Sequence, residues 1–378
     1  MGTIRTQAAS TAQGATGAMA GVDPSGPVGA VPAGAAAGRA PATAARRGPD
    51  ARVLGYLALL AFFAVLPFVG AYPVFIMKGL CFALFACAFN LLLGYTGLLS
   101  FGHAAFLGLA SYVTGYGLHG LGLSAPVGIV AGTLAAAALG LLVGWLAIRR
   151  SGIYFSMITL ALSQMLYFIF LQAPFTGGED GLQGVPRGSL FGLALDNDTT
   201  LYYVVLAIVA AAFALIVRIV HSPFGQVLTA IRENEPRAIS LGYDVARFKL
   251  LAFVLSAALT GLAGALKTHV LGFATLSDAV WTTSGAVILM TLVGGVGTMI
   301  GPILGAFLVV ALENKVGDAG SWLKDVTGVE WFGTLGEAVT IVTGLIFVIC
   351  VLAFRRGIVG EAGAWWAARR RQARDGAA

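Results

Sequence analysis

The sequence predicts an all-α, polytopic membrane protein, a bundle of about ten transmembrane segments (range about eight to ten) in which some helices are broken at glycines. Three observations lead to this prediction. Of the 378 residues, 58% are hydrophobic and only 11% are charged, whereas a soluble domain carries roughly a quarter charged residues. The hydrophobic residues form long apolar runs. Two of these runs are interrupted by glycine-rich breaks, at residues 94–103 and 294–302.

The chain begins and ends in segments of a different kind. Residues 1–52 are rich in Ala, Gly, Thr, Ser and Pro and contain no apolar run, which predicts a disordered tail. A signal peptide is not expected, because the first apolar run begins only near Val53 and has no cleavage-like end. Residues 356–378 form a second tail with a basic run at 369–371. Basic segments favour the cytoplasmic side, so we expect both tails there.

Apolar segments fill residues 53–355, and most have roughly the 20 residues that a helix needs to cross a bilayer. Their ranges are 53–71, 73–94, 101–119, 124–148, 153–172, 200–220, 248–271, 279–293, 297–313 and 335–354. Segment 279–293 is short, so residues 279–313 form either two full spans or a re-entrant hairpin. Both alternatives leave the loops on the same sides of the membrane.

The charges of the loops agree with an even number of crossings and with cytoplasmic termini. Basic residues gather at Arg149, at Arg150 and in the 218–249 segment, which we place inside. The 173–199 loop, which we place outside, carries more acidic than basic residues. The net charge of +6 therefore reflects the flanks of membrane segments and does not indicate nucleic-acid binding.

The spacing of capping residues predicts short helices in the charged cytoplasmic segment 222–248. Ser222, Asn234 and Asp244 are each suited to accept a backbone N–H at the start of a helix. The helix after Asn234 is expected at 236–241, ended by the glycine that follows it. So short a helix needs tertiary support. The segment is either an ordinary structured loop or an element that docks in a groove on a partner.

The two glycine-rich breaks predict a transport pathway. Backbone polar groups in a broken membrane helix are tolerated only where protein or a water-filled cavity covers them. Glycine suits such positions because it adopts positive φ at little cost. The residues expected at the broken helices and along the pathway are Gly97, Ser100, Gly102, His103, Gly295, Gly297 and Thr298. Gly140, inside an uninterrupted apolar segment, is expected to tolerate a larger side chain better than Gly297 does.

Few ionisable residues lie inside the apolar segments. His103 is either a proton relay or substrate ligand, or a neutral side chain bonded to the backbone of the broken helix. We favour the second alternative because no carboxylate lies nearby in the sequence. Lys78, Lys267 and Glu313 lie near segment ends, where the lysines are expected to reach toward the membrane interface. The sequence therefore predicts an uncharged pathway, suited to a small neutral or zwitterionic solute.

Four motifs, taken in order, resemble the permease subunits of branched-chain amino acid ATP-binding-cassette (ABC) importers. They are Gly94-Tyr-Thr-Gly-Leu-Leu-Ser-Phe-Gly-His-Ala-Ala-Phe106, Thr176-Gly-Gly-Glu-Asp-Gly-Leu182, the stretch from Ser222 to Gly242, and Gly294-Gly-Val-Gly-Thr298 with Gly301-Pro302. The resemblance covers about residues 53–355. The 173–199 loop and the Arg-Glu-Asn-Glu stretch at 232–235 are more similar to the LivM-type subunit than to its LivH-type companion.

The resemblance implies the ABC importer permease fold and a non-catalytic transport subunit that needs no cofactor and no metal. Its implied partners are a second homologous permease subunit, two ATPase subunits and an extracytoplasmic solute-binding protein. The implied location is the bacterial inner membrane, with both termini cytoplasmic. The chain has no Gly-x-x-x-x-Gly-Lys-Ser/Thr phosphate loop, so ATP is expected to bind to the ATPase subunits.

The resemblance also assigns residues to the contacts with these partners. ATPase coupling is expected at Glu233, Glu235, Pro236, Arg237, Ala238 and Gly242. Contact with the binding protein is expected at Glu179 and Asp180.

Three alternatives to the import of branched-chain amino acids or related small solutes stay open. Within the same class, the solute is urea or a short amide. An ion-driven secondary transporter would need carboxylates in the membrane near the broken helices, and none is evident in the sequence. A membrane-embedded enzyme would need a cluster of catalytic side chains, whereas the histidines are scattered at positions 103, 119, 221 and 269. The sequence does not identify the solute.

Overall fold

The computed structural model describes residues 51–70, 72–190, 193–327, 344–345, 348 and 357–361. The predicted segment 335–354 and both predicted tails lie wholly or largely outside these described residues. The described part is helical apart from short strand pairings, of which the longest joins β1 (Ser189–Leu190) to β2 (Leu193–Ala194) in antiparallel register. The all-α class is therefore confirmed for this part of the chain.

Most helices follow the predicted apolar segments, but α11 continues to Thr327, past the end predicted at residue 313. The α-helices are α1 (Ala51–Val65), α2 (Pro73–Thr96), α3 (His103–His119), α4 (Ala125–Ala147), α5 (Ile153–Gln172), α6 (Asp198–Val220), α7 (Pro223–Glu233), α8 (Glu235–Ser240), α9 (Val245–Leu271), α10 (Trp281–Gly294) and α11 (Gly301–Thr327). Short 3-10 helices are η1 (Leu66–Val69), η2 (Pro174–Thr176), η3 (Gly178–Asp180) and η4 (Leu276–Ala279).

The structure supports a multi-pass membrane protein. Five helices, α2, α4, α5, α6 and α9, are long and apolar enough to cross a membrane. Shorter apolar helices occupy Leu54–Phe68 and Trp281–Gly294. With 14 residues, α10 is about 21 Å long, less than the roughly 30 Å of a hydrocarbon core. The total of about ten crossings stays a prediction.

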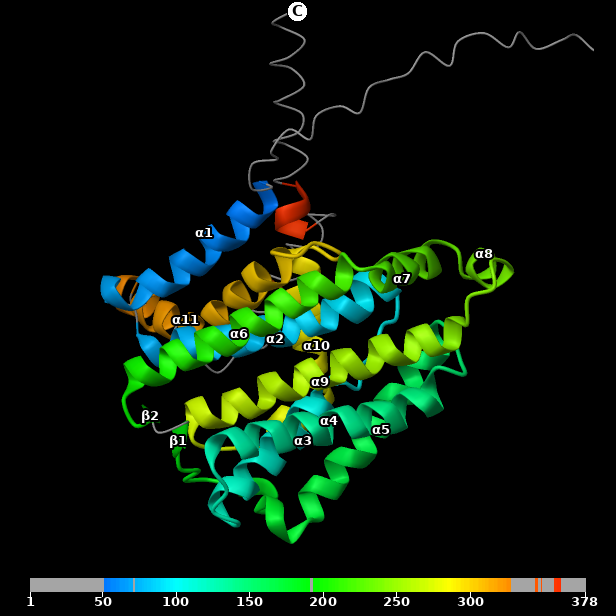
Figure 1. Cartoon of the computed structure of the whole chain (residues 1–378). Coiled ribbons are helices and arrows are strands. Elements are labelled where there is room, and N and C mark those ends of the chain that lie inside the picture. Colours follow the sequence, from blue (N-terminus) through cyan, green and yellow to red (C-terminus); the bar gives the residue numbers. More distant parts are fainter. Residues whose placement is uncertain are drawn as a thin grey trace, which may run out of the picture. The chain divides into compact units, whose positions relative to one another are not determined.

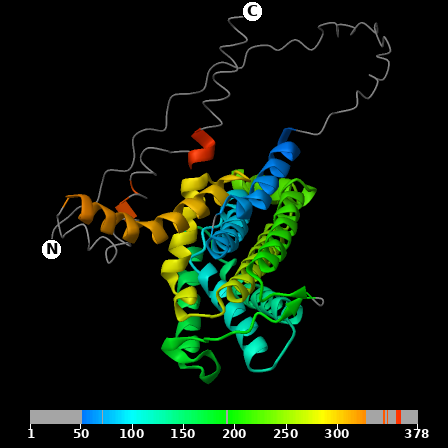
Figure 2. The ribbon, with the colours of Figure 1, turned by 90° about the vertical axis from the view of Figure 1, so that its left-hand side faces the viewer.

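Helices α2 and α9 form the centre of the bundle. Helix α9 packs against α2, α3 and α4, and α2 also packs against α6 and α11. Figure 1 shows α2 and α9 running side by side through the bundle, and Figure 2 shows α10 and α11 (yellow to orange) together on one flank. The most apolar window of α2 is 83% buried, whereas those of α5 and α6 are each 28% buried. Helices α5 and α6 thus leave apolar surface for lipid or for a partner subunit.

Small residues allow α4 to approach α9 closely. A Cβ atom added at Gly261 would overlap the Cβ atom of Ala136, and one added at Gly140 would overlap the Cβ atom of Ala257. Such contacts between small residues are typical of helix pairs in membranes. Gly140 is therefore crowded, because an uninterrupted helix can still have a crowded face; whether it tolerates a larger side chain better than Gly297, which has φ +77°, stays a prediction.

A proline explains how α1 is attached to α6. Pro67, in η1, has no backbone N–H, so the carbonyl of Phe63 lacks its usual helical donor. The Tyr202 hydroxyl on α6 donates to the Phe63 carbonyl at 2.5 Å, and the Tyr203 hydroxyl donates to the Ala64 carbonyl at 3.2 Å. Side chains of α6 thus satisfy carbonyls that the end of α1 leaves free.

The two ends of the bundle carry different elements (Figure 1). One end carries α7 and α8, and we call it the α7–α8 end. The other carries β1, β2 and η4, and we call it the hairpin end. There the long loop after α5 is fixed to the segment after α9: the Leu182 N–H donates to the Ala274 carbonyl at 2.8 Å, and the Ala274 N–H donates back at 2.9 Å.

Candidate functional site

The first glycine-rich break joins α2 to α3. Helix α2 ends at Gly97, which adopts φ +77°, a left-handed conformation that favours glycine. Gly102 has an ordinary φ, but an added Cβ would lie 2.8 Å from the carbonyl oxygen of Thr159. The predictions that Gly97 leaves helical geometry and that Gly102 packs closely are both confirmed.

Hydroxyl groups satisfy the backbone of this first break. The Ser156 hydroxyl on α5 donates to the Leu99 carbonyl at 2.6 Å, and the Phe101 N–H donates to the Thr159 hydroxyl at 3.2 Å. The predicted pathway residue Ser100 accepts from the Gly102 N–H at 3.2 Å. The polar backbone of the break is thus covered by protein, as a broken membrane helix requires.

The second glycine-rich break joins α10 to α11. Gly295 and Gly297 adopt φ of 124° and 77°, so both predicted departures from helical geometry are confirmed. The Thr298 hydroxyl donates to the Gly295 carbonyl at 2.7 Å and accepts from the Gly301 N–H at 3.2 Å. A Cβ added at Gly294 would overlap the carbonyl of Gly301, so the two helices meet with no room for a methyl group.

The structure brings the two breaks together, and a side chain of α2 bridges them. The Asn90 amide donates to the Thr298 carbonyl at 2.8 Å, and its oxygen accepts from the Gly297 N–H at 2.9 Å. The Tyr95 hydroxyl donates to the Gly297 carbonyl at 3.0 Å. Neither Asn90 nor Tyr95 was among the residues predicted to line the pathway. An amide inside an apolar run was the available signal for Asn90, since a polar side chain in a membrane helix needs a partner.

Arg232 of α7 reaches the same junction. Its guanidinium donates a hydrogen bond to the carbonyl of Gly94, in the last turn of α2. A Cβ added at Gly97 would lie 3.1 Å from Arg232 Cγ, and one added at Gly297 would lie 3.4 Å from Arg232 Nη1. Arg232 belongs to the Arg-Glu-Asn-Glu stretch of the cytoplasmic segment, but no local pattern marks its long-range contact.

His103 starts α3 and is buried, but its partner differs from the predicted one. Its Nε2 lies 2.9 Å from the hydroxyl of Ser256, on α9. That hydroxyl donates its hydrogen to the Ala88 carbonyl at 2.6 Å, so Nε2 of His103 is the donor of the first bond. The rings of Phe89, Phe106 and Phe253 meet the imidazole edge-on. We predicted that the His103 side chain bonds to the backbone of the broken helix. The structure shows that it bonds instead to the Ser256 hydroxyl on α9.

The predicted helix caps between α6 and α9 are confirmed. Ser222 accepts from the Gly225 N–H at 3.4 Å, Asn234 from the Arg237 N–H at 3.0 Å, and Asp244 from the Arg247 N–H at 3.2 Å. Helix α8 covers Glu235–Ser240, one residue earlier than predicted. Gly242 follows it with φ +87°.

The six residues predicted to couple to an ATPase differ in exposure. Glu233, Pro236, Arg237 and Gly242 are exposed. Ala238 is buried and packs in a small core with Ile231 and Val245, so it fixes α8 rather than presenting a contact surface.

Glu235 is half-buried and forms an ion pair with Lys249 at 2.6 Å, so its nearest charged partner lies in its own chain. Large apolar side chains are exposed instead on this segment. Ile239 is 57% exposed, Leu241 68% and Tyr243 41%. We call these three residues the α8 apolar surface. The predicted coupling residues are mainly the charged ones of this segment and do not include this surface.

The acidic residues predicted to touch a binding protein lie in η3, at the hairpin end. Glu179 and Asp180 are both exposed. The strand-like pairing of Leu182 with Ala274 holds the loop in place below them. Their position leaves them accessible, and their role stays a prediction.

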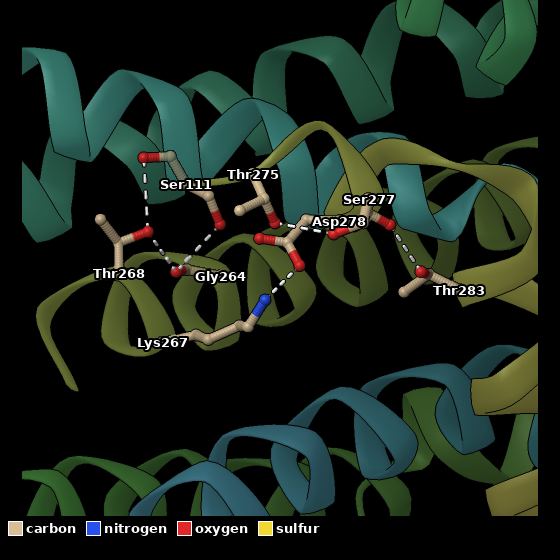
Figure 3. Close-up of polar contacts among 8 residues, drawn as sticks. All are labelled: Ser111, Gly264, Lys267, Thr268, Thr275, Ser277, Asp278 and Thr283. Atoms are coloured by element: carbon tan, nitrogen blue, oxygen red, sulfur yellow. Dashed lines mark hydrogen bonds and ion pairs between the residues drawn. The ribbon is translucent and has the colours of Figure 1, made fainter. Parts of the chain in front are cut away.

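A buried ion pair at the hairpin end corrects the predicted role of Lys267. The Lys267 ammonium, on α9, binds the carboxylate of Asp278, in η4, and the two side chains are only 8% and 6% exposed. Figure 3 shows Lys267 pointing to Asp278 beside hydroxyls of Ser111 and Thr268 that both bond to the Gly264 carbonyl. Lys267 therefore does not reach the interface, because a carboxylate inside the bundle holds it. Asp278 had no predicted role.

The comparisons with known proteins agree with these observations. The family model described as the permease component of the branched-chain amino acid transport system matches residues 74–354. The high-affinity branched-chain amino acid transport system permease protein LivM of Escherichia coli is 28% identical over 287 residues, 68% of each chain. LivM of Salmonella typhimurium matches equally. The ribose import permease protein RbsC of Bacillus subtilis is 27% identical over 48% of this chain and 51% of its own. No solved structure matches the chain.

The family match covers both glycine-rich breaks and the α7–α8 segment between them. The described helices also have the length and apolar character that a membrane-spanning subunit requires. The chain therefore belongs to the branched-chain amino acid transport permease family, the non-catalytic transmembrane subunits of ABC importers.

Proposed function

We propose that this chain is the LivM-like subunit of a bacterial inner-membrane importer that moves branched-chain amino acids or related small solutes. The observation that carries the proposal is the match to LivM permeases over 68% of both chains, joined to the family match over residues 74–354. In this proposal a second homologous permease subunit pairs with the chain. Two ATPase subunits bind the cytoplasmic side, an extracytoplasmic binding protein delivers the solute, and both termini of the chain are cytoplasmic.

The α8 apolar surface supports the position of the ATPase subunits. Ile239, Leu241 and Tyr243 are 57%, 68% and 41% exposed on a segment rich in charge. An apolar surface rimmed by charges is typical of a protein-binding site. Exposed Glu233 and Arg237 supply the polar rim. We therefore place the ATPase contact on the α8 apolar surface, with the α7–α8 end on the cytoplasmic side.

A second candidate solute class is supported by other relatives. The autoinducer 2 import system permease protein LsrC of Klebsiella pneumoniae is 32% identical over 48% of this chain and 52% of its own. Together with the ribose permease, it shows that relatives of this chain serve solutes that are not amino acids. These matches cover about half of each chain, so the amino acid solute is favoured.

Uptake by the reconstituted complex tests the proposal. The chain is purified with its partner permease and ATPase subunits, placed in proteoliposomes and supplied with the binding protein. Radiolabelled leucine, isoleucine, valine, ribose and urea are then compared with and without ATP. We expect uptake of the branched-chain amino acids that depends on ATP and resists ionophores. Uptake by this chain alone without ATP would show a carrier or channel, and ATP-driven uptake of ribose or urea alone would reassign the solute.

A further inference from the structure

We propose that Arg232 is the positioning residue that connects the ATPase-contacting segment to both helix breaks, so that movement of α7 and α8 reaches the breaks through one side chain. This inference rests on the proposed function, because it concerns how an ATPase on α8 would act on the pathway. It adds a specific mechanical connection, made by a residue with no predicted role.

Arg232 donates to a backbone carbonyl that the first break leaves without its usual helical donor. In a continuous helix the carbonyl of Gly94 would accept from the N–H of Leu98. Because α2 ends at Gly97, the Leu98 N–H instead donates to the Leu92 carbonyl at 3.2 Å. The Gly94 carbonyl is then one of the free acceptors at the end of a helix. The Arg232 guanidinium donates to it, and a charged donor strengthens such a bond.

Glycines at both breaks make the space that Arg232 occupies. An added Cβ at Gly97 would lie within 3.1 Å of its side chain, and one at Gly297 would lie within 3.4 Å. The second break is joined to the same place by Asn90, which binds the backbone of Gly297 and Thr298. Arg232 therefore touches the point where the two breaks meet, and a shift of its guanidinium acts on both.

The segment that carries Arg232 is built to move as one unit. Ile231 of α7, Ala238 of α8 and Val245 of α9 share a small core. Phe224 stacks on Phe248 with ring centroids 5.6 Å apart, and Glu235 pairs with Lys249. These contacts tie α7, α8 and the start of α9 together. A force on the α8 apolar surface thus reaches Arg232 without being absorbed by a loose loop.

The competing interpretation is that Arg232 is a solvated charge in the last turn of α7, where a cation favours the helix dipole. Arg247 provides the contrast. Both arginines are exposed, but Arg247 pairs with Asp244 in its own helix turn, whereas Arg232 binds the Gly94 carbonyl on α2. A general charge effect would be similar at both arginines, whereas a mechanical connection is specific to Arg232.

The first test measures the solute imported per ATP hydrolysed by the reconstituted complex. We expect Arg232→Ala to lower this ratio by about tenfold, within the usual range of coupling between sites, while ATP hydrolysis stays within about twofold of wild type. The ratio for Arg232→Lys should lie between those of wild type and Arg232→Ala, because an ammonium keeps the charge but lacks the planar set of donors of a guanidinium. The control Arg247→Ala should leave the ratio unchanged. A wild-type ratio for Arg232→Ala would overturn the inference.

A covalent replacement of the bond provides the second test. The Cβ position at residue 97 lies 3.6 Å from the Cβ atom of Arg232, within the roughly 3.5–4.5 Å that a disulfide spans. In the double variant Gly97→Cys/Arg232→Cys, the reduced complex should be uncoupled, and oxidation should raise the ratio to that of Gly97→Cys alone, which carries the same strain at positive φ. The single cysteine variants should not respond to oxidation. If oxidation leaves the import ratio of the double variant below that of Gly97→Cys alone, the inference of a rigid connection between α7 and the first break is contradicted.

A third readout separates this inference from the identity of the solute. Met299, half-buried in the second break, is replaced by Cys after Cys81, Cys87 and Cys350 have been replaced by Ala. The rate of labelling by a thiol reagent is then measured with and without ATP. We expect ATP to change the rate in this variant but not when Arg232→Ala is added. An equal ATP effect in both would contradict the inference, even if the complex imported none of the tested solutes.

Discussion

The two ends of the bundle hold their helices together by different physical means. At the α7–α8 end, Asn90, Tyr95 and Arg232 bind backbone groups that glycine-rich breaks set free. At the hairpin end, α9 is held to η4 by the buried pair of Lys267 and Asp278. Losing one hydrogen bond to the backbone costs about 1–3 kcal/mol. Separating a buried ion pair costs more, about 3–5 kcal/mol, because each charge is left without water and without its partner. The comparison suggests that the α7–α8 end is suited to movement and that the hairpin end is fixed.

Removal of one charge at the hairpin end should have the largest effect. Asp278→Ala leaves the Lys267 ammonium buried without its partner, so we expect a loss of about 3–5 kcal/mol in the free energy of unfolding in detergent. Chemical unfolding of the purified complex measures it.

The double variant Lys267→Met/Asp278→Leu is the matched control for that loss. It removes both charges but keeps similar volume, so it should recover most of the stability. If Asp278→Ala alone is as stable as wild type, the hairpin end is not held by the ion pair.

Crowding at the second break should have the next largest effect. Gly294 and Gly285 both lie in α10, but an added Cβ overlaps the Gly301 carbonyl at the first and meets nothing within 4 Å at the second. We expect Gly294→Ala to destabilise by about 1–3 kcal/mol, as overpacking does. Gly285→Ala should be neutral or stabilising by up to about 1 kcal/mol, because Ala is the better helix former. Thermal unfolding of both variants compares them, and equal stability would show that the break is an ordinary loop.

Loss of the amide that bridges the breaks should be milder but functionally visible. Asn90→Ala leaves the Gly297 N–H and the Thr298 carbonyl without this partner, which should cost about 1–3 kcal/mol. Solute uptake should fall while the complex still assembles. Asn314→Ala, which removes only a bond to Val310 one helical turn away, is the control. If Asn314→Ala loses uptake as Asn90→Ala does, the loss cannot be attributed to the bonds between Asn90 and the second break.

The smallest effect on stability is expected on the α8 apolar surface, where two adjacent residues face opposite ways. Ala238 is 2% exposed and Ile239 is 57% exposed. Ala238→Asp should disturb the packing of α8, whereas Ile239→Asp should change stability by no more than about 0.5 kcal/mol. The Ile239→Asp variant should lose only the binding of the ATPase subunit, which co-purification measures. Retained ATPase binding in Ile239→Asp would move the docking surface elsewhere.

Features that depend on neighbouring residues can be predicted from the sequence alone. Long apolar runs specify membrane helices, and the caps at Ser222, Asn234 and Asp244 specify the ends of short ones. Such signals are local, because a capping side chain binds an N–H only two or three residues away. The positive φ of Gly97 and Gly297 is also local, since glycine adopts it at little cost.

Contacts between residues on different elements become visible only in the folded structure. Asn90 binds Gly297 from a position 207 residues earlier, and Arg232 reaches Gly94 across 138 residues. Lys267 near the end of α9 suggested an interfacial side chain until Asp278 was found beside it. Likewise, the crowding of Gly140 is set by Ala257 on another helix. In all four cases the partner lies on another element, and the packing of the elements brings the two residues together; even the 11 residues between Lys267 and Asp278 include the turn that folds η4 back onto α9.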